Sequence, residues 1–221
     1  SQQERSSFPS LLPEQLSALN ANYQVREAGM ERVAGYNAQA ILFQPKDNLR
    51  YTHKIWAHTD SGLLLKAAVL GDKNQMIEQY AFTQLQIGGN IDRSWIGAKG
   101  LAGRGTELPV SPETTKGSKA INSGWVVDAL PAGFRKTREI QRPMRDKHAP
   151  VTQIVFSDGL SAISIFIEPA DGDEDDVDGL SSRGAVNLYH KVLDKHLITV
   201  VGEVPPRTVM QVLDSVRYNG K

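Results

Sequence analysis

Short strand-like segments, each closed by a turn within a few residues, constrain the fold of this 221-residue chain more than any other feature. The first half is expected to contain five such strands: Tyr23–Glu27, Ala38–Phe43, Tyr51–His58, Leu63–Leu70 and Gln75–Ile87. The residues between them are typical of turns: Gly35, Lys46-Asp47-Asn48, Asp60-Ser61-Gly62 and Gly71-Asp72-Lys73. Parallel strands need a crossover of about a dozen residues or more, so neighbours joined this closely must pair antiparallel.

A stretch rich in Gly, Ser, Thr, Lys and Pro, from Gly88 to Gly124, separates this half from the rest of the chain. A loop of this length inside one compact domain is uncommon, so we place a domain boundary here. The chain is long enough for two modest domains. We therefore predict a β domain in residues 1–92, a linker in residues 93–124 and a C-terminal domain in residues 125–221.

One hairpin stands out in the second half. Two strand-like segments, Thr152–Phe156 and Ala162–Ile167, flank the pair Asp158-Gly159, which is a strong signal for a two-residue turn. Such a turn sets the register, pairing Phe156 with Ser161, Ile154 with Ile163 and Thr152 with Ile165. One face then carries the apolar side chains of Ile154, Phe156, Ile163, Ile165 and Ile167. The opposite face is mixed, with Gln153, Ser157 and Ser164 beside Val155, Leu160 and Phe166, and it suits a second layer or a partner.

A second strand pair and a helix complete this half. Ala185–Val192 and Leu197–Val204 are expected to pair around Asp194-Lys195, and Pro205-Pro206 ends the second strand. A helix should follow and lie on the sheet, because four apolar residues have helical spacing: Val209, Val212, Leu213 and Val216. A further short helix is expected near Pro13. The predicted fold class is α+β, mostly antiparallel β.

Composition excludes some functions and leaves the compartment open. Lys+Arg and Asp+Glu number 25 each, so no net positive field draws in nucleic acid. Cysteine is absent, which excludes disulfides and thiolate chemistry. No apolar run approaches the roughly 20 residues that cross a bilayer. The first residues, Ser1–Arg5, lack the pattern of a signal peptide, so either a signal has been removed or the chain stays in the cytoplasm.

No set of residues predicts catalysis or a metal site. His53 and His58 lie an odd number of residues apart, which on a regular strand sends their side chains to opposite faces. His190 and His196 lie near one hairpin but lack a third ligand. The turn at Ser157 does not show the G-x-S-x-G elbow, and the glycine-rich linker lacks the ending of a phosphate loop. We therefore expect no catalytic residue, no metal ligand and no cofactor.

An acidic run from Asp171 to Gly179 resembles a calcium loop only in part. Its sixth position is Asp176, where a calcium loop needs Gly, and its twelfth is Ser182, where a bidentate Glu is needed. Like charges at this density repel each other and favour an extended, solvated loop. We expect this run to be independent of calcium.

A set of short motifs runs in order through both halves of the chain. In the first half they are Arg32–Gly35, Arg50-Tyr51 leading into Trp56, Asp60–Lys66 and Glu78–Leu85. In the second half they are Leu130–Phe134, Ser157–Leu160 and Thr199–Pro205. Each motif is weak alone, but the ordered set resembles the RseB/MucB family of sigma-factor regulatory proteins across nearly the whole chain.

This resemblance implies a fold and a function. It implies part of a LolA-like unclosed β-barrel with helices over its concave face, joined by a linker to a small C-terminal α+β domain. Because the resemblance begins part-way through the large domain, we expect only its second half here, and no lipid-binding residue can be assigned. Family members act in the periplasm of Gram-negative bacteria. They bind a membrane-anchored anti-sigma factor of RseA/MucA type and shield it from regulated proteolysis, and lipid or lipopolysaccharide relieves that block.

The resemblance also suggests a site. We expect the anti-sigma factor to contact the C-terminal domain on its mixed sheet face and on the surface that faces the first domain. The mixed sheet face is more apolar than solvent favours, and the resemblance covers this domain without gaps. The expected contact residues are Val155, Leu160, Phe166, Trp125 and Phe134. A homo-oligomer is also compatible with the sequence.

Two other classes of function stay open. One is a periplasmic lipid or lipoprotein carrier of LolA type, against which the appended second domain argues. The other is an unrecognised hydrolase, which would need a nucleophile, a base and an orienting group that the sequence does not present.

Overall fold

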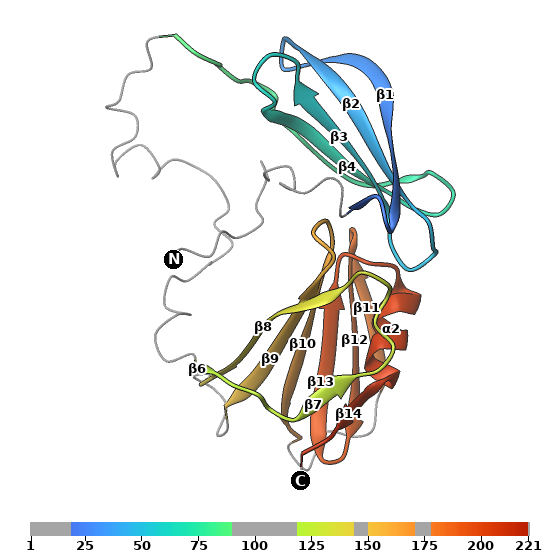
Figure 1. Ribbon diagram of the computed structural model, residues 1–221, viewed down its shortest axis with the longest axis vertical. Helices are drawn as coiled ribbons and strands as arrows, with labels where there is room; N and C mark the ends of the chain where they lie inside the picture. The colour runs from blue at the N-terminus through green and yellow to red at the C-terminus, as the bar shows by residue number, and fades with distance from the viewer. Residues whose placement is uncertain (1–18, 90–118, 144–149, 171–177, 221) are drawn as a thin grey trace.

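The computed structural model describes residues 19–89, 119–143, 150–170 and 178–220, which form two β domains, one above the other in Figure 1. The helix expected near Pro13, residues 93–118 of the predicted linker and residues 171–177 of the acidic run lie outside this part of the chain. Within it, every strand pair is antiparallel, which confirms the predicted fold class.

The N-terminal domain is a five-stranded meander in the order β1-β2-β3-β4-β5. Its strands are β1 (Tyr23–Val33), β2 (Tyr36–Pro45), β3 (Thr52–His58), β4 (Leu64–Leu70) and β5 (Met76–Ala81). Each of the four expected turns separates two neighbouring strands.

Two strands of this domain differ in length from the prediction. β1 continues past Glu27, because a bulge at Gly29, where φ is 87°, lets it go on pairing with β2. β5 ends at Ala81 instead of Ile87. Leu85 and Ile87 instead pack against the apolar cluster around Trp56.

A seven-stranded sheet in the order β11-β12-β13-β10-β9-β8-β6 forms most of the C-terminal domain. Its strands are β6 (Lys119–Ala120), β8 (Arg135–Arg142), β9 (Val151–Ser157), β10 (Ala162–Pro169), β11 (Gly179–Arg183), β12 (Val186–Leu193) and β13 (His196–Gly202). In front of this sheet in Figure 1 lie the strand pair β7 (Trp125–Val127) and β14 (Val216–Tyr218) and the helix α2 (Pro206–Asp214). β6 falls inside the predicted linker, and the predicted domain boundaries stay a prediction.

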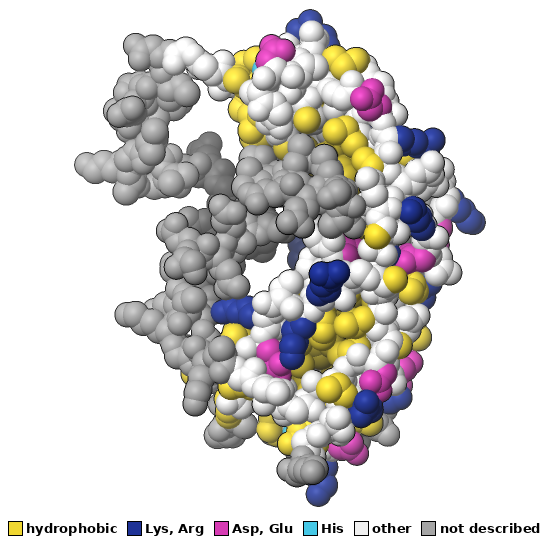
Figure 2. Space-filling model, viewed as in Figure 1, with side chains coloured by type: hydrophobic (Ala, Val, Ile, Leu, Met, Phe, Trp, Pro, Cys, Tyr) yellow, Lys and Arg dark blue, Asp and Glu magenta, His cyan; other side chains and the backbone are white. Residues whose placement is uncertain are grey.

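The side of the sheet that faces α2, which we call the inner face, holds the core of the C-terminal domain. All five apolar residues assigned to one face from the sequence are buried there: Ile154, Phe156, Ile163, Ile165 and Ile167. Burying each such side chain contributes roughly 1.5–3 kcal/mol. Val209, Val212 and Leu213 of α2 complete the cluster. Figure 2 shows apolar side chains at the surface on this side of the domain.

The predicted register of the β9–β10 hairpin is wrong by two residues. Phe156 pairs with Ile163 and Ile154 with Ile165, so the turn has four residues, Asp158 to Ser161. The carboxylate Oδ1 of Asp158 accepts hydrogen bonds from the backbone N–H groups of Leu160 (2.9 Å) and Ser161 (2.8 Å), which favours the longer turn. A shift of two residues keeps every side chain on its face, so the predicted faces are right although the register is not.

The helix prediction is confirmed for α2 but not for its last residue. Pro206 occupies the first turn, where a missing N–H group costs nothing. The helix ends at Asp214, and Val216 belongs to β14, where it pairs with Val127 and stays buried. Among the described residues, no helix has the length and apolar character needed to span a membrane.

Candidate functional site

The two domains meet in a junction that combines apolar and polar contacts. The N-terminal domain contributes Tyr23, Arg50, Tyr51 and His53 to this interdomain junction, and the C-terminal domain contributes Ala132, Phe134, Asp158, Ser161 and Asn187. Leu160, in the β9–β10 turn, packs against an apolar cluster of the N-terminal sheet that includes Phe43 and Ile55.

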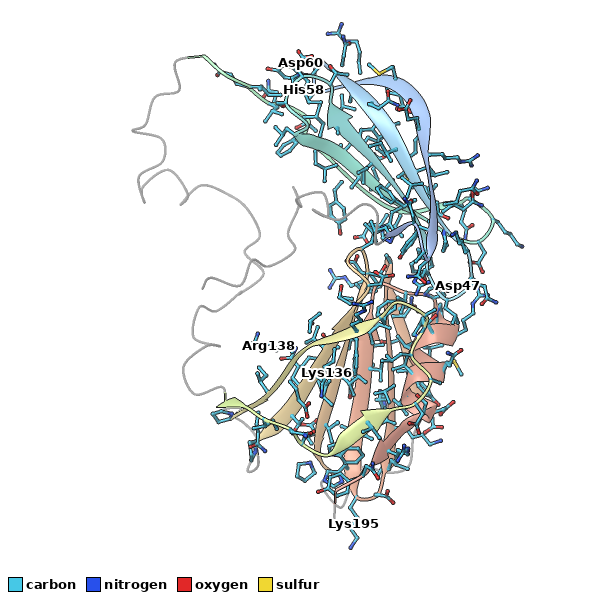
Figure 3. All side chains as sticks on the ribbon, viewed as in Figure 1. Asp47, His58, Asp60, Lys136, Arg138 and Lys195 are labelled. Atoms are coloured by element: carbon cyan, nitrogen blue, oxygen red, sulfur yellow. The ribbon has the colours of Figure 1, made fainter. Side chains whose placement is uncertain are left out.

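Arg50 is the central residue of the junction. Its side chain is 0% exposed and its guanidinium donates to three acceptors: Oδ2 of Asp158 at 2.8 Å, Oδ2 of Asp47 at 2.6 Å and the carbonyl oxygen of Ala132. The Tyr23 and Phe134 rings flank the guanidinium, with centroids 5.5 and 5.2 Å from its central carbon. A planar, weakly hydrated guanidinium suits such a site better than an ammonium group. Figure 3 labels Asp47 where the two domains meet.

Asp158 is the partner of Arg50 and has no free acceptor site. Besides the two turn N–H groups on Oδ1, its Oδ2 accepts hydrogen bonds from Nε of Arg50 and from the Tyr23 hydroxyl, each at 2.8 Å. Its side chain is 0% exposed. A buried carboxylate is tolerated when it is paired and hydrogen-bonded in this way. Burial, and then the nearby Asp158 charge, raise the pKa of Tyr23, so its hydroxyl stays a donor.

His53 is the second titratable group of the junction. Its Nε2 lies 3.3 Å from Oγ of Ser161, and its ring is buried. Burial lowers the pKa of His53 to about 4, although the Asp158 charge acts in the opposite direction. The imidazole is therefore neutral at neutral pH.

A second group of contacts lies along the other side of the junction. Nδ2 of Asn187 donates to the Tyr51 hydroxyl (3.0 Å) and to the carbonyl oxygen of Val204 (2.7 Å). Oγ1 of Thr208, on α2, donates to the carbonyl oxygen of Leu49 at 2.8 Å. The bonds to Tyr51 and to Leu49 connect the two domains, whereas the bond to Val204 holds the Asn187 side chain within its own domain.

Gly133 lies at a point where the two domains come close together. Its φ is 83°, a conformation that side chains disfavour, and a Cβ atom there would lie 2.1 Å from the side chain of Asn22. A larger residue at position 133 would therefore strain the backbone and require the Asn22 side chain to move.

The polar groups of the junction form contacts with one another and with the backbone. Its carboxylate, guanidinium and hydroxyl groups are all hydrogen-bonded to one another or to the backbone. Among the described residues, no group of three or more His, Asp or Glu side chains could hold a metal ion.

The five predicted partner-contact residues do not form one patch. Leu160 and Phe134 lie at the junction, and Phe134 is only 7% exposed. Val155 and Phe166 are half-buried on the outer face, the side of the C-terminal sheet opposite α2. There the strand register places Val155 in one row with Ser164, Val201 and Leu188.

Trp125 lies elsewhere again, beside a hollow of about 670 Å³ at the end of the C-terminal domain. It is 8% exposed, and its ring meets those of His196 and Tyr218 at centroid distances of 5.2 and 5.1 Å. Ile121 and Ile167 also line the hollow. As a set, the five contact residues remain a prediction.

Comparison with known proteins identifies the family. Residues 1–99 match the profile of the MucB/RseB N-terminal domain, and residues 119–217 match that of the MucB/RseB C-terminal domain. The chain belongs to the MucB/RseB family. The sigma factor AlgU regulatory protein MucB of Pseudomonas aeruginosa is 34% identical over 206 residues, which are 91% of this chain and 62% of that protein.

Solved structures of MucB share the fold. MucB in complex with the periplasmic part of MucA has a TM-score of 0.76 at 31% identity, covering 95% of this chain and 71% of that one. A structure of MucB alone has a TM-score of 0.62 at 30% identity, covering 91% of this chain and 65% of that one. The chain thus spans about 62% of the curated MucB sequence that it matches.

Three of the motifs that carry the resemblance meet at the junction. Arg50-Tyr51, Leu130–Phe134 and Ser157–Leu160 supply most of its polar contacts, although they are far apart in the chain. The sequence predicted a turn at Asp158 but no contact between the domains for Arg50 or Asp158. The motifs themselves were the available signal, because no local pattern links residues 108 positions apart.

Proposed function

We propose that this chain is a negative regulator of an envelope-stress sigma-factor pathway. It binds the periplasmic part of a membrane-anchored anti-sigma factor and protects that protein from regulated proteolysis, and it acts in the periplasm. The observation that carries this proposal is the similarity, in fold and sequence together, to MucB solved with the periplasmic part of MucA. The proposed role is binding, which is in line with the family of regulatory proteins to which the chain belongs.

We propose the outer face of the C-terminal sheet as the main contact surface for this partner. Val155 and Phe166 stand on neighbouring strands there, and Val201 and Leu188 extend the same apolar surface across β13 and β12. β11 ends this sheet and is largely exposed, so it offers main-chain groups for a peptide strand. Apolar anchors combined with main-chain pairing along a strand are a common mode of peptide recognition.

Titration calorimetry of the 221-residue chain with the periplasmic domain of a MucA-type anti-sigma factor tests this proposal. Phe166→Asp places a charge on the outer face and should weaken binding by about tenfold or more, equivalent to about 1.4 kcal/mol. Met76→Asp is the matched control, because Met76 is an exposed apolar residue on β5 of the other domain. Equal affinity of Phe166→Asp and the unsubstituted chain would place the contact surface elsewhere.

Lipid or lipopolysaccharide sensing stays a prediction from the family resemblance. The alternative function, a LolA-type carrier of lipid or lipoprotein, predicts that lipid binds while the anti-sigma domain does not. The same calorimetric experiment, run with both ligands, separates the two functions.

A further inference from the structure

We propose that Arg50 and Asp158 are positioning residues, whose buried ion pair holds the two domains in the arrangement that binds the anti-sigma factor. This inference rests on the proposed function and adds a residue-level requirement to it. Neither residue needs to touch the partner.

The geometry of the pair makes it specific for one arrangement. The Arg50 guanidinium reaches one acceptor in its own domain, Asp47, and two in the other domain, Asp158 and the Ala132 carbonyl group. Charge-assisted hydrogen bonds are short and directional, so a rotation of one domain would break several of them at once. Apolar contacts such as those of Leu160 tolerate small displacements and do not by themselves select one orientation.

The energetic properties of buried ion pairs point the same way. Desolvation of both charges offsets most of their attraction, so such a pair adds little net stability over a packed apolar pair. Losing one partner is different, because the remaining charge is then buried without compensation. An arrangement of the domains that separates Arg50 from Asp158 while either group stays buried is therefore penalised, although the pair adds little to the stability of either domain.

The chain itself connects this pair to the proposed contact surface. Asp158 lies in the turn between β9 and β10, and Val155 and Phe166 lie on those two strands. Fixing the tip of the hairpin against the N-terminal domain therefore fixes the outer face relative to that domain. The chain as a whole matches MucB bound to MucA with a TM-score of 0.76 and MucB alone with a TM-score of 0.62, which is a difference between those two structures.

Asp158→Asn is the most selective substitution for a test. The amide oxygen can still accept from the N–H groups of Leu160 and Ser161, so the turn is kept. The amide nitrogen, however, faces two donors, Nε of Arg50 and the Tyr23 hydroxyl, and the ion pair is lost. Asp128→Asn is the matched control, because Asp128 pairs with Arg217 on the exposed surface of the C-terminal domain.

Two measurements test the proposal: one gives the distance between the domains, and the other gives the affinity for the partner. The chain has no cysteine, so Asn37→Cys on β2 and Met210→Cys on α2 allow one spin label on each domain. Pulsed electron resonance then gives the distance distribution between the labels. Calorimetry with the periplasmic domain of a MucA-type anti-sigma factor gives the affinity of the same variants, and circular dichroism checks that they are folded.

We expect Asp158→Asn to broaden the distance distribution and to weaken binding by about tenfold or more, while Asp128→Asn matches the unsubstituted chain in both. If Asp158→Asn does not fold, Arg50→Lys replaces it, since a lysine keeps the charge but cannot reach the three acceptors.

An unchanged distance distribution overturns the proposal, and so does a broadened one with unchanged affinity. If the unsubstituted chain does not bind the anti-sigma domain, the proposed function and the positioning role are both overturned. If Asp128→Asn weakens binding and Asp158→Asn does not, the positioning role alone is overturned.

Discussion

Lowering the pH should destabilise the folded chain through His53. In the folded protein, burial lowers the pKa of His53 to about 4, whereas an exposed histidine in the unfolded chain titrates near 6.5. Between these values the unfolded state binds a proton that the folded state does not, so the free energy of unfolding falls as the pH falls. Stability is complete above the unfolded pKa and is lost progressively below it.

The size of this effect follows from the two pKa values. The contribution of His53 falls by about 2 kcal/mol between pH 7 and pH 5, and by about 3 kcal/mol at pH 4. Urea denaturation of the unsubstituted chain and of His53→Gln at several pH values measures it, since glutamine does not titrate and removes this part of the slope. His58→Gln is the matched control, because His58 lies on the same strand but at the far, partly exposed end.

Only the difference between variants is informative, because carboxylates also contribute to the pH dependence. Burial raises the pKa of Glu203. Hydrogen bonds from Lys136 and Ser123 lower the pKa of Glu139 despite its burial. Glu203 and Glu139 are present in every variant, so their contributions cancel in the difference. If the His53→Gln chain loses stability between pH 7 and pH 5 as steeply as its parent, the burial of a neutral His53 in the junction is refuted.

Three further predictions concern stability. Ile165→Ala removes a fully buried side chain and should cost about 2–5 kcal/mol in urea denaturation, whereas Ser164→Ala, on the opposite face, should change little. Tyr51→Phe removes the hydroxyl that Asn187 donates to and should lower the free energy of unfolding by about 1 kcal/mol. Tyr218→Phe, at an exposed residue, should leave the free energy of unfolding nearly unchanged. Lys195 has a positive φ of 62° in the β12–β13 turn, and a left-handed backbone costs a non-glycine residue roughly 1 kcal/mol. Lys195→Gly should therefore raise the melting temperature, and a lower melting temperature would contradict this.

Alternation and turn chemistry predicted much of the fold, because both act over a few residues. Ile154, Ile163 and Ile165 are on the inner face as predicted, since a side-chain period of two does not depend on the exact register. The Asp194-Lys195 turn was a weak signal in the sequence, because neither residue is glycine, yet both adopt positive φ values in the structure. The register of β9 and β10 failed because Asp-Gly usually forms a two-residue turn, and here the Asp158 carboxylate stabilises a four-residue turn instead.

The candidate site was harder to predict, because its residues acquire their properties only after folding. His53 looked like an isolated polar residue on a strand, and nothing near it in the sequence indicates that Ser161 and Asp158 will surround it. Trp125 and Phe134 were expected to contact a partner. In the structure both are mainly buried, Trp125 beside Tyr218 and Phe134 against Arg50.

The family motifs and the proposed partner surface occupy different parts of the molecule. Arg50, Tyr51, Phe134 and Asp158 all lie inside motifs that carry the resemblance, and all four contribute to the junction. Val155 and Phe166 lie outside those motifs, on the two strands that the Asp158 turn connects. On the two proposals together, substitutions in the junction should weaken anti-sigma binding by changing the arrangement of the domains, whereas substitutions on the outer face should weaken it by changing the contact itself.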